Sequence, residues 1–336
     1  MIKPEIMADL KTTYMGLELK NPVIVGSCGL TSSIENIRQI EKKGAAAIVL
    51  KSVFEEEILV ELTGKASKAR NVSQYYPELS ETIDYIDKHT KKENLKNYLK
   101  LVNQAKQESV IPVIASINCV TDGEWVDFAS RIIEAGADAI ELNIFLNPTD
   151  TDDKDFEKTT MKIIKKVLKH VSIPVSVKLS NCFTNLAQTL VKISETGISG
   201  MVLFNRYFCP DIDIDYFYLF AANKFSSPEE YVKPLRYISL LSDKVKCSLA
   251  ACTGIHYGNS LIKQILAGAD AVQIVSTLYL NGIEYIATIL DDIEKWMQSK
   301  GYYNLSQFKG KMSYKNMPNP AVYERMQFMK HYARIG

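Results

Sequence analysis

The sequence predicts a (β/α)8 TIM barrel of the α/β class, with long loops after the second and sixth strands. Eight short apolar runs alternate along the chain with amphipathic helical patterns. Each run is nearly continuous rather than alternating between apolar and polar residues, as parallel strands covered on both faces require. Successive strand–helix units joined by right-handed crossovers close into a barrel. An open doubly wound sheet is disfavoured because no G-x-G-x-x-G follows the first run.

The expected strands begin in two recognisable ways. Some follow a proline that opens the apolar run, and others follow a glycine at which a helical pattern ends. Such a glycine fits the position just after a helix, because glycine becomes left-handed at low cost. These glycines are Gly44, Gly136, Gly197 and Gly268. The runs, in chain order, are NPVIVGS (21–27), KKGAAAIVLKS (42–52), IPVIASIN (111–118), EAGADAIELNIF (134–145), IPVSVKLS (173–180), ETGISGMVLFNR (195–206), KCSLAACTG (246–254) and LAGADAVQIVSTL (266–278).

Two segments are longer than the repeat requires. Residues 54–108 follow the second strand and include RNVSQYYPELSETIDYI, and residues 207–234 separate the sixth strand from its helix. Loops of this length in a compact domain are usually lids or binding elements. Both leave from the carboxyl ends of strands, where barrel enzymes carry out their chemistry. We therefore expect one barrel domain over residues 1–336, with its site at this face.

The composition narrows the class of protein. Of the 336 residues, 46% are hydrophobic and 24% charged, and the net charge of +1 gives no reason to expect nucleic acid or an acidic membrane as a partner. No apolar run approaches the roughly 20 residues that span a bilayer, and the start has no apolar signal sequence. We expect a soluble cytoplasmic protein with reduced thiols. The cysteines form no C-x-x-C and the histidines no H-x-x-x-H, so no metal site is expected.

Polar residues stand at the ends of the expected strands, which a barrel brings to one mouth. Lys51 and Lys178 lie within the second and fifth strands, and a buried lysine requires an anion or other acceptors. The T-G pair at 253–254 and the S-T pair at 276–277 suit a backbone nest for phosphate. Asparagine and lysine side chains suit the polar edge of a flat heterocycle. Together they predict FMN (flavin mononucleotide) across the mouth. The polar strand-end residues are Ser27, Cys28, Lys51, Ser52, Asn118, Cys119, Asn143, Lys178, Ser180, Asn205, Arg206, Cys252, Thr253, Gly254, Ser276 and Thr277.

The same stretches resemble the dihydroorotate dehydrogenases, especially the soluble class 1 enzymes, over nearly the whole chain. The matching stretches are TTYMGLELKNPVIVGSCG, IVLKS, ELN, VKL, the asparagine at 205, CTGI, VQIVSTL and QFKGK. The resemblance implies an FMN-dependent oxidoreductase that converts dihydroorotate to orotate in pyrimidine biosynthesis. It implies that substrate is bound by Asn71, Asn143 and Asn205. It implies that FMN is bound by Ser27, Cys28, Lys51, Asn143, Lys178, Asn205, Thr253, Gly254, Ser276 and Thr277.

One position departs from this family. The family reads L-N-x-S-C-P-N or L-N-x-S-S-P-N after its fourth strand, and its cysteine or serine removes a proton from the substrate. Here the stretch is NIFLNP (143–148), and Leu146 occupies the position of the base. Cys119, Cys182 and Tyr75 are candidate replacements. The candidate catalytic set is Lys51, Asn71, Asn143, Asn205 and Cys119.

Other functions stay open from the sequence. Phe145 and Leu146 would suit a flavin oxidoreductase acting on a different cyclic substrate. Lys51 or Lys178 could form a Schiff base in a phosphate-binding lyase, and a non-catalytic flavin-binding barrel is a further alternative. The expected partner is a small planar heterocycle. Through the resemblance, the implied acceptor is fumarate, or NAD reached through a second subunit, and the implied assembly is a homodimer.

Overall fold

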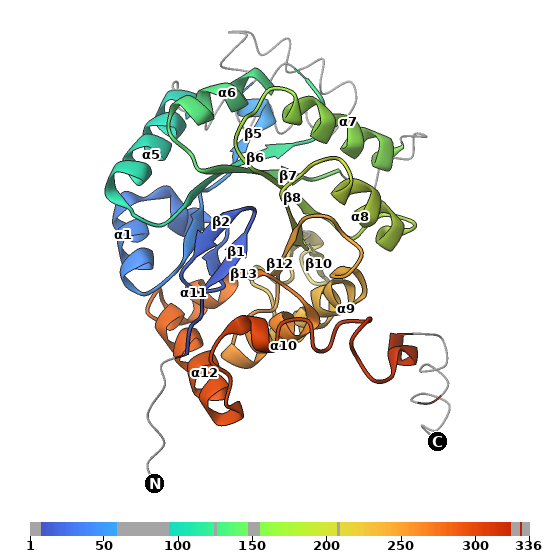
Figure 1. Ribbon diagram of the computed structural model, residues 1–336. Coiled ribbons are helices and arrows are strands. Elements are labelled where there is room, and N and C mark those ends of the chain that lie inside the picture. Colours follow the sequence, from blue (N-terminus) through green and yellow to red (C-terminus); the bar gives the residue numbers. More distant parts are fainter. Residues whose placement is uncertain are drawn as a thin grey trace.

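The structure, a computed structural model, describes residues 8–58, 94–123, 126–146, 155–206, 209–323 and 330. Parallel strands close into a barrel that helices surround (Figure 1). The barrel strands are β3 (Val23–Val25), β4 (Ala47–Val49), β6 (Val113–Cys119), β7 (Ala139–Ile144), β8 (Val175–Leu179), β9 (Gly200–Leu203), β12 (Ser248–Cys252) and β13 (Ala271–Ile274). The sheet runs β4-β3-β13-β12-β9-β8-β7-β6, and pairing of β4 with β6 closes it. The predicted (β/α)8 TIM barrel is confirmed.

Helices follow the strands around the barrel. Gly44, Gly136, Gly197 and Gly268 have φ values of 106°, 97°, 99° and 116°, so each turns the chain in the left-handed region after a helix, as predicted. The helices are α1 (Ile34–Lys42), α5 (Asn94–Glu108), α6 (Asp127–Glu134), α7 (Phe156–Leu168), α8 (Leu186–Ser194), α9 (Val232–Leu241), α10 (Gly258–Ala267), α11 (Ser276–Asn281) and α12 (Tyr285–Lys300). In the part of the chain described, no helix is both long and apolar enough to cross a bilayer.

A hairpin of β1 (Thr12–Tyr14) and β2 (Leu17–Leu19) lies across the barrel in Figure 1. The backbone N–H of Met15 donates to Ser248 Oγ at the start of β12, over 3.1 Å. The Thr12 hydroxyl donates to the carbonyl of Asp270 just before β13. Because both partners lie at the amino ends of strands, this hairpin covers the amino-terminal end of the barrel. The carboxyl-terminal end is left for a site.

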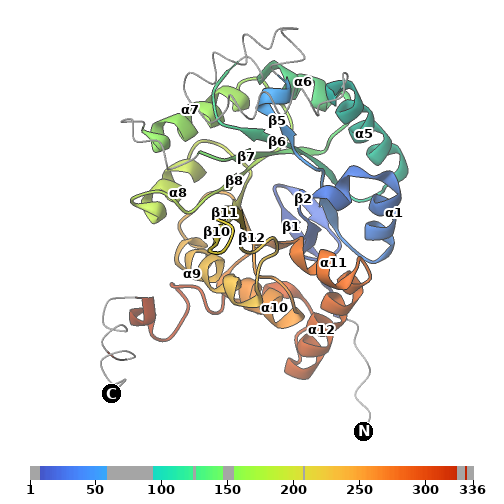
Figure 2. The ribbon, with the colours of Figure 1, turned by 180° about the vertical axis from the view of Figure 1, so that it is seen from behind.

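Both long loops contain regular structure. After β4, the chain adds β5 (Val53–Phe54) beside β6 and later enters α5; residues 59–93 lie outside the described residues. After β9, a hairpin of β10 (Pro210–Asp213) and β11 (Tyr218–Ala221) appears near the barrel centre in Figure 2. It leads through a 3-10 turn at Pro228–Tyr231 into α9.

The barrel interior holds both apolar and polar side chains. Ile24, Ala47 and Ala139 cluster with Tyr14 and Met15 of the hairpin. The buried polar residues of the strands are Ser116, Glu141, Ser176, Lys178 and Gln273. Polar groups that are buried need partners, so the structure concentrates its polar side chains beneath the mouth.

Candidate active site

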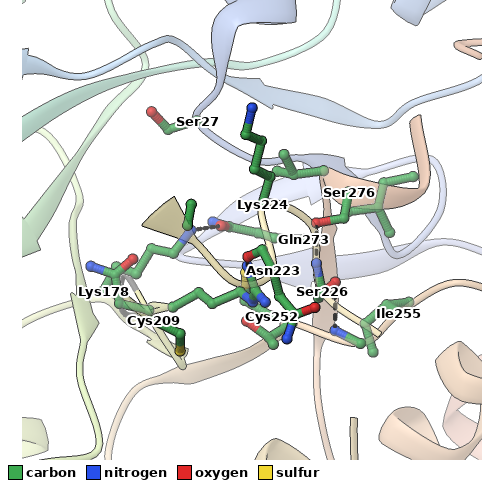
Figure 3. Close-up of a pocket in the computed structure, with 17 residues that line it drawn as sticks. Ser27, Lys178, Cys209, Asn223, Lys224, Ser226, Cys252, Ile255, Gln273 and Ser276 are labelled. Atoms are coloured by element: carbon green, nitrogen blue, oxygen red, sulfur yellow. Dashed lines mark hydrogen bonds between the residues drawn. The ribbon is translucent and has the colours of Figure 1, made fainter. Parts of the chain in front are cut away.

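A cavity of about 420 Å³ opens at the carboxyl ends of the barrel strands (Figure 3). Its volume lies within the roughly 300–1,000 Å³ typical of small-molecule sites. Strand ends far apart in the sequence meet here, from β3 to β13. The polar strand-end residues named from the sequence that line it are Ser27, Lys178, Asn205, Arg206, Cys252, Thr253, Gly254 and Ser276.

Lys178 is the buried cation of this cavity. It is only 6% exposed, and its Nζ donates to Oε1 of Gln273 over 3.1 Å (Figure 3). Burial by itself lowers the pKa of Lys178, but Cys252 and Glu141 raise it, and the net shift is upward. The side chain is therefore an ammonium at neutral pH, and it has capacity to donate to a ligand.

A cluster of hydrogen-bond donors forms a second part of the cavity. The backbone N–H of Gly254 donates to Ser226 Oγ over 3.4 Å, and the N–H of Ser226 donates to Ser276 Oγ over 3.0 Å. Ser226 Oγ also lies 3.0 Å from Nε2 of His256. These amides and hydroxyls, together with Arg206 and Lys224 of the cavity wall, suit an anionic group such as a phosphate.

The backbone at this cluster is unusually constrained. Thr253 has φ of 81°, which is uncommon for a β-branched residue, and such strain of about 1–3 kcal/mol is typical of functional sites. Gly254 has φ of 74°, and a Cβ there would lie 2.1 Å from the backbone nitrogen of Tyr231. Glycine at 254 is thus required both by conformation and by the close approach of the chain before α9.

Two asparagines lie together at the mouth. The amide nitrogen of Asn205 donates to Oδ1 of Asn143. Asn143 faces Lys178 across the β7–β8 register, and Asn205 lines the cavity. The pair places amide donors and acceptors on the strands beside Lys178, and their binding roles stay a prediction.

Lys51 does not join this cavity. The prediction that Lys51 is buried is wrong: it is exposed and lines a neighbouring cavity of about 290 Å³ with Ser52, Phe54 and Tyr98. β4 ends at Val49, so Lys51 lies beyond the strand, where its side chain is exposed to solvent. Ser52 connects the two regions, because its hydroxyl lies 3.0 Å from that of Ser27.

Cys28 and Thr277 lie behind the cavity wall rather than in it. Cys28 is half-buried, and its backbone N–H donates to the Thr31 hydroxyl. Thr277 is 1% exposed, and its hydroxyl donates to the carbonyl of His256. The Thr277 hydrogen bond connects α11 to the loop after β12, whereas the Cys28 hydrogen bond is local to the turn after β3.

The candidates for the general base differ in their exposure to solvent. Cys119 is fully buried, and burial with the neighbouring carboxyls of Glu55 and Glu56 raises its thiol pKa well above the ordinary value. A buried, protonated thiol is poorly suited to remove a proton at neutral pH. Cys182 is exposed, and Leu146 is 6% exposed within the apolar core. Asn71 and Tyr75 lie outside the described residues.

Several residues of the site were not singled out from the sequence. Glu141 and Gln273 each interrupt an apolar strand with a polar side chain, AIELNI and AVQI, and that interruption was the available signal. Cys209 and Ser226 come from the loop after β9 and line the cavity. Their role depends on how this loop folds back, which no local pattern reveals.

The fold and its mouth are those of the barrel enzymes, whose active sites lie at the carboxyl ends of the strands. The family model described as dihydroorotate dehydrogenase matches residues 81–297. The chain belongs to the dihydroorotate dehydrogenase family, and it is an oxidoreductase acting on CH–CH groups of that type.

Curated relatives match over most of the chain. A protein of Methanocaldococcus jannaschii named dihydroorotate dehydrogenase B (NAD(+)), catalytic subunit, is 26% identical over 87% of this chain and 94% of its own length. The protein of that name from Thermoplasma acidophilum is 25% identical over 90% of this chain and 99% of its own length. A putative dihydroorotate dehydrogenase A (fumarate) of Aeropyrum pernix is 24% identical over 90% of this chain and 97% of its own length.

Proposed function

We propose that the chain oxidises dihydroorotate to orotate with FMN bound across the mouth of the barrel. The observation that carries this is the meeting of the Lys178 ammonium and the Gly254–Ser226–Ser276 donors in one cavity. FMN combines a flat ring with a polar edge and a phosphate, so it needs both kinds of donor. The residues present fit this cofactor.

Lys178 would face the polar edge of the flavin ring. A fixed positive charge in a water-poor site stabilises negative charge that develops there during reduction. The Gly254 amide and the hydroxyls of Ser226 and Ser276 would hold the phosphate. When bound, FMN supplies the acceptor for hydride.

The Asn143–Asn205 pair would bind the substrate. A side-chain amide offers both donors and an acceptor, which match the alternating N–H and C=O groups of a pyrimidine ring. Asn71, outside the described residues, keeps the substrate-binding role that the family resemblance implies. Lys51 lines the neighbouring cavity, so no role in this cavity is assigned to it. Asn205 thereby orients the ring that loses hydride.

Proton removal requires a group that can contact the substrate. Leu146 cannot accept a proton, and Cys119 is enclosed in the core. The cavity wall contains the thiols of Cys209 and Cys252, of which Cys209 is exposed. We assign proton removal to Cys209.

Anaerobic mixing tests this function. Protein loaded with FMN is mixed with dihydroorotate, and the visible absorbance of the flavin is followed. Loss of that absorbance, with orotate formed in equal amount, is the expected result. Flavin that remains oxidised at saturating dihydroorotate would rule the function out.

A different cyclic substrate is the second candidate. It is favoured by Leu146, which is apolar and buried where the family places its base. A substrate whose reaction needs no protein base would tolerate this change. Bleaching by a related cyclic amide, but not by dihydroorotate, would establish this candidate instead.

The electron acceptor is proposed from the names of the relatives, which give NAD(+) or fumarate. Reoxidation of the reduced flavin by fumarate alone would identify fumarate. A requirement for an added protein before NAD(+) can react would identify NAD(+).

We infer a homodimer that uses the β10–β11 hairpin. Its apolar side chains are 41–86% exposed: Ile212, Ile214, Tyr216, Phe217, Tyr218, Leu219 and Phe220. Contiguous exposed apolar surface of this kind usually marks an interaction site. Light scattering should give twice the chain mass for the wild type, and a Leu219→Ser variant should shift towards the monomer. A wild-type monomer would contradict this assembly.

A further inference from the structure

Three side chains from three barrel strands form a continuous hydrogen-bonded line beneath the mouth. Glu141 lies on β7, Lys178 on β8 and Gln273 on β13. In the sheet, β13 is separated from β8 by β12 and β9. The Lys178–Gln273 hydrogen bond therefore crosses the barrel interior rather than following neighbouring strands.

The glutamine amide connects the two charged groups. Lys178 Nζ donates to Gln273 Oε1 over 3.1 Å, and Gln273 Nε2 donates to Glu141 Oε2 over 2.5 Å. Only one amide orientation suits this order, because an ammonium can only donate and so requires the amide oxygen. The amide N–H₂ is then directed at the carboxylate, which accepts.

Burying these three polar side chains costs free energy of folding. Glu141 is 0% exposed, Gln273 1% and Lys178 6%. Burial raises the pKa of Glu141, against which Lys178 and the Gln273 hydrogen bond act. In the described structure, Glu141 Oε1 has no hydrogen-bond partner. Apolar residues at such positions are often as good or better for stability, so stability alone does not account for the carboxylate.

The three residues of this hydrogen-bonded line do not all lie at the same distance from the cavity. Lys178 and Gln273 line the cavity, whereas Glu141 does not. Glu141 consequently reaches a bound molecule only through the other two. Its charge raises the pKa of Lys178, together with Cys252, and opposes the effect of burial on the ammonium.

We propose that Glu141 and Gln273 are positioning residues for Lys178. The carboxylate, acting through the glutamine amide, keeps the ammonium charged and fixes it at the polar edge of the flavin. This inference rests on the proposed function, since the ligand of Lys178 is the FMN ring. It adds a carboxylate outside the cavity, and an amide in the cavity wall that connects it to Lys178, and the two together set the affinity for the cofactor.

A charge exchange tests the proposal. Glu141→Gln removes the carboxylate with little change of shape. The double variant E141Q/Q273E returns one carboxylate and one amide to the line in exchanged positions, so the ammonium again has a counter-charge. The control is Asp138→Asn, at the amino end of the same strand, where the carboxylate accepts from Lys106 and from the Val113 N–H.

FMN dissociation constants are measured by flavin fluorescence, and urea unfolding is measured without FMN. E141Q should bind FMN at least about tenfold more weakly. The double variant should recover to within about threefold of the wild type. D138N should lose stability yet bind FMN normally.

Two results would overturn the proposal: E141Q binding FMN as tightly as the wild type, or a double variant no better than E141Q. If E141Q does not fold, the double variant decides, because it keeps the charges of the wild type. Wild-type protein without FMN affinity would instead overturn the proposed function, and with it the flavin part of this inference. The unfolding data would still show whether exchanging the carboxylate and the amide restores the stability that E141Q loses.

Discussion

Replacing Glu55 by glutamine is expected to flatten the pH dependence of stability between pH 4.5 and about 7. Glu55 is fully buried at the rim of the barrel. Its carboxyl accepts from the backbone N–H groups of Val120 and Thr121 over 2.7 and 2.9 Å, and from the Thr121 hydroxyl. Burial is the largest effect and raises the pKa of Glu55 from 4.5 to about 7, although these hydrogen bonds oppose the rise.

The direction in which stability changes with pH follows from proton binding to Glu55 in the folded and unfolded states. Between pH 4.5 and about 7, folded protein keeps a proton on Glu55 that the unfolded chain has lost. The stability contributed by this group is therefore fully present below pH 4.5 and is lost as the pH rises through about 7. At about 1.4 kcal/mol for each pH unit, the whole effect is about 3 kcal/mol. Glutamine does not titrate, so Glu55→Gln lacks it.

Urea unfolding at pH 4.5 and above pH 7 measures this effect. Between the two conditions, the wild type should lose about 3 kcal/mol more free energy of unfolding than Glu55→Gln. Glu134→Gln, which removes an exposed carboxyl from α6, should behave as the wild type. Equal pH dependence in the wild type and Glu55→Gln would refute the reasoning, because the buried carboxyl would then titrate normally.

Three further variants examine the site. Gly254→Ala should lower the free energy of unfolding by more than about 3 kcal/mol, because the new Cβ would overlap the backbone nitrogen of Tyr231. Gly197→Ala is the control: a Cβ there meets nothing within 4 Å, so it should lower the free energy of unfolding by about 1 kcal/mol. Urea unfolding measures both. Cys119→Ala should keep kcat within about threefold, since this thiol is buried and protonated, and a loss of ~10² or more would make it the base. Asn205→Ala should lower kcat/KM for dihydroorotate about 10–100-fold by removing the donor to Asn143, and an unchanged value would exclude Asn205 from substrate binding.

The fold was predictable because its signals are local. A glycine such as Gly136 ends a helix for reasons contained in a few residues, and the apolar runs identify the strands without long-range information. The predicted strand ends then supplied part of the cavity wall. Lys178, Asn205 and Gly254 all follow from their places in the repeat.

The features that the sequence did not reveal depend on how the strands are placed in the folded barrel. The exposure of Lys51 follows from the end of β4 at Val49, and the repeat does not encode where that strand ends. The line from Glu141 through Gln273 joins residues 132 positions apart and crosses the interior. Each was visible in the sequence only as a polar residue inside an apolar run.

Titration of cofactor-free protein with FMN tests the central claim most directly. We expect the flavin fluorescence to be quenched on binding, and the quenching to saturate at one FMN per chain. Riboflavin should bind much more weakly, because it lacks the phosphate assigned to the Gly254 and Ser276 donors. An absence of FMN binding, or equal affinity for FMN and riboflavin, would contradict the assignment of this cavity.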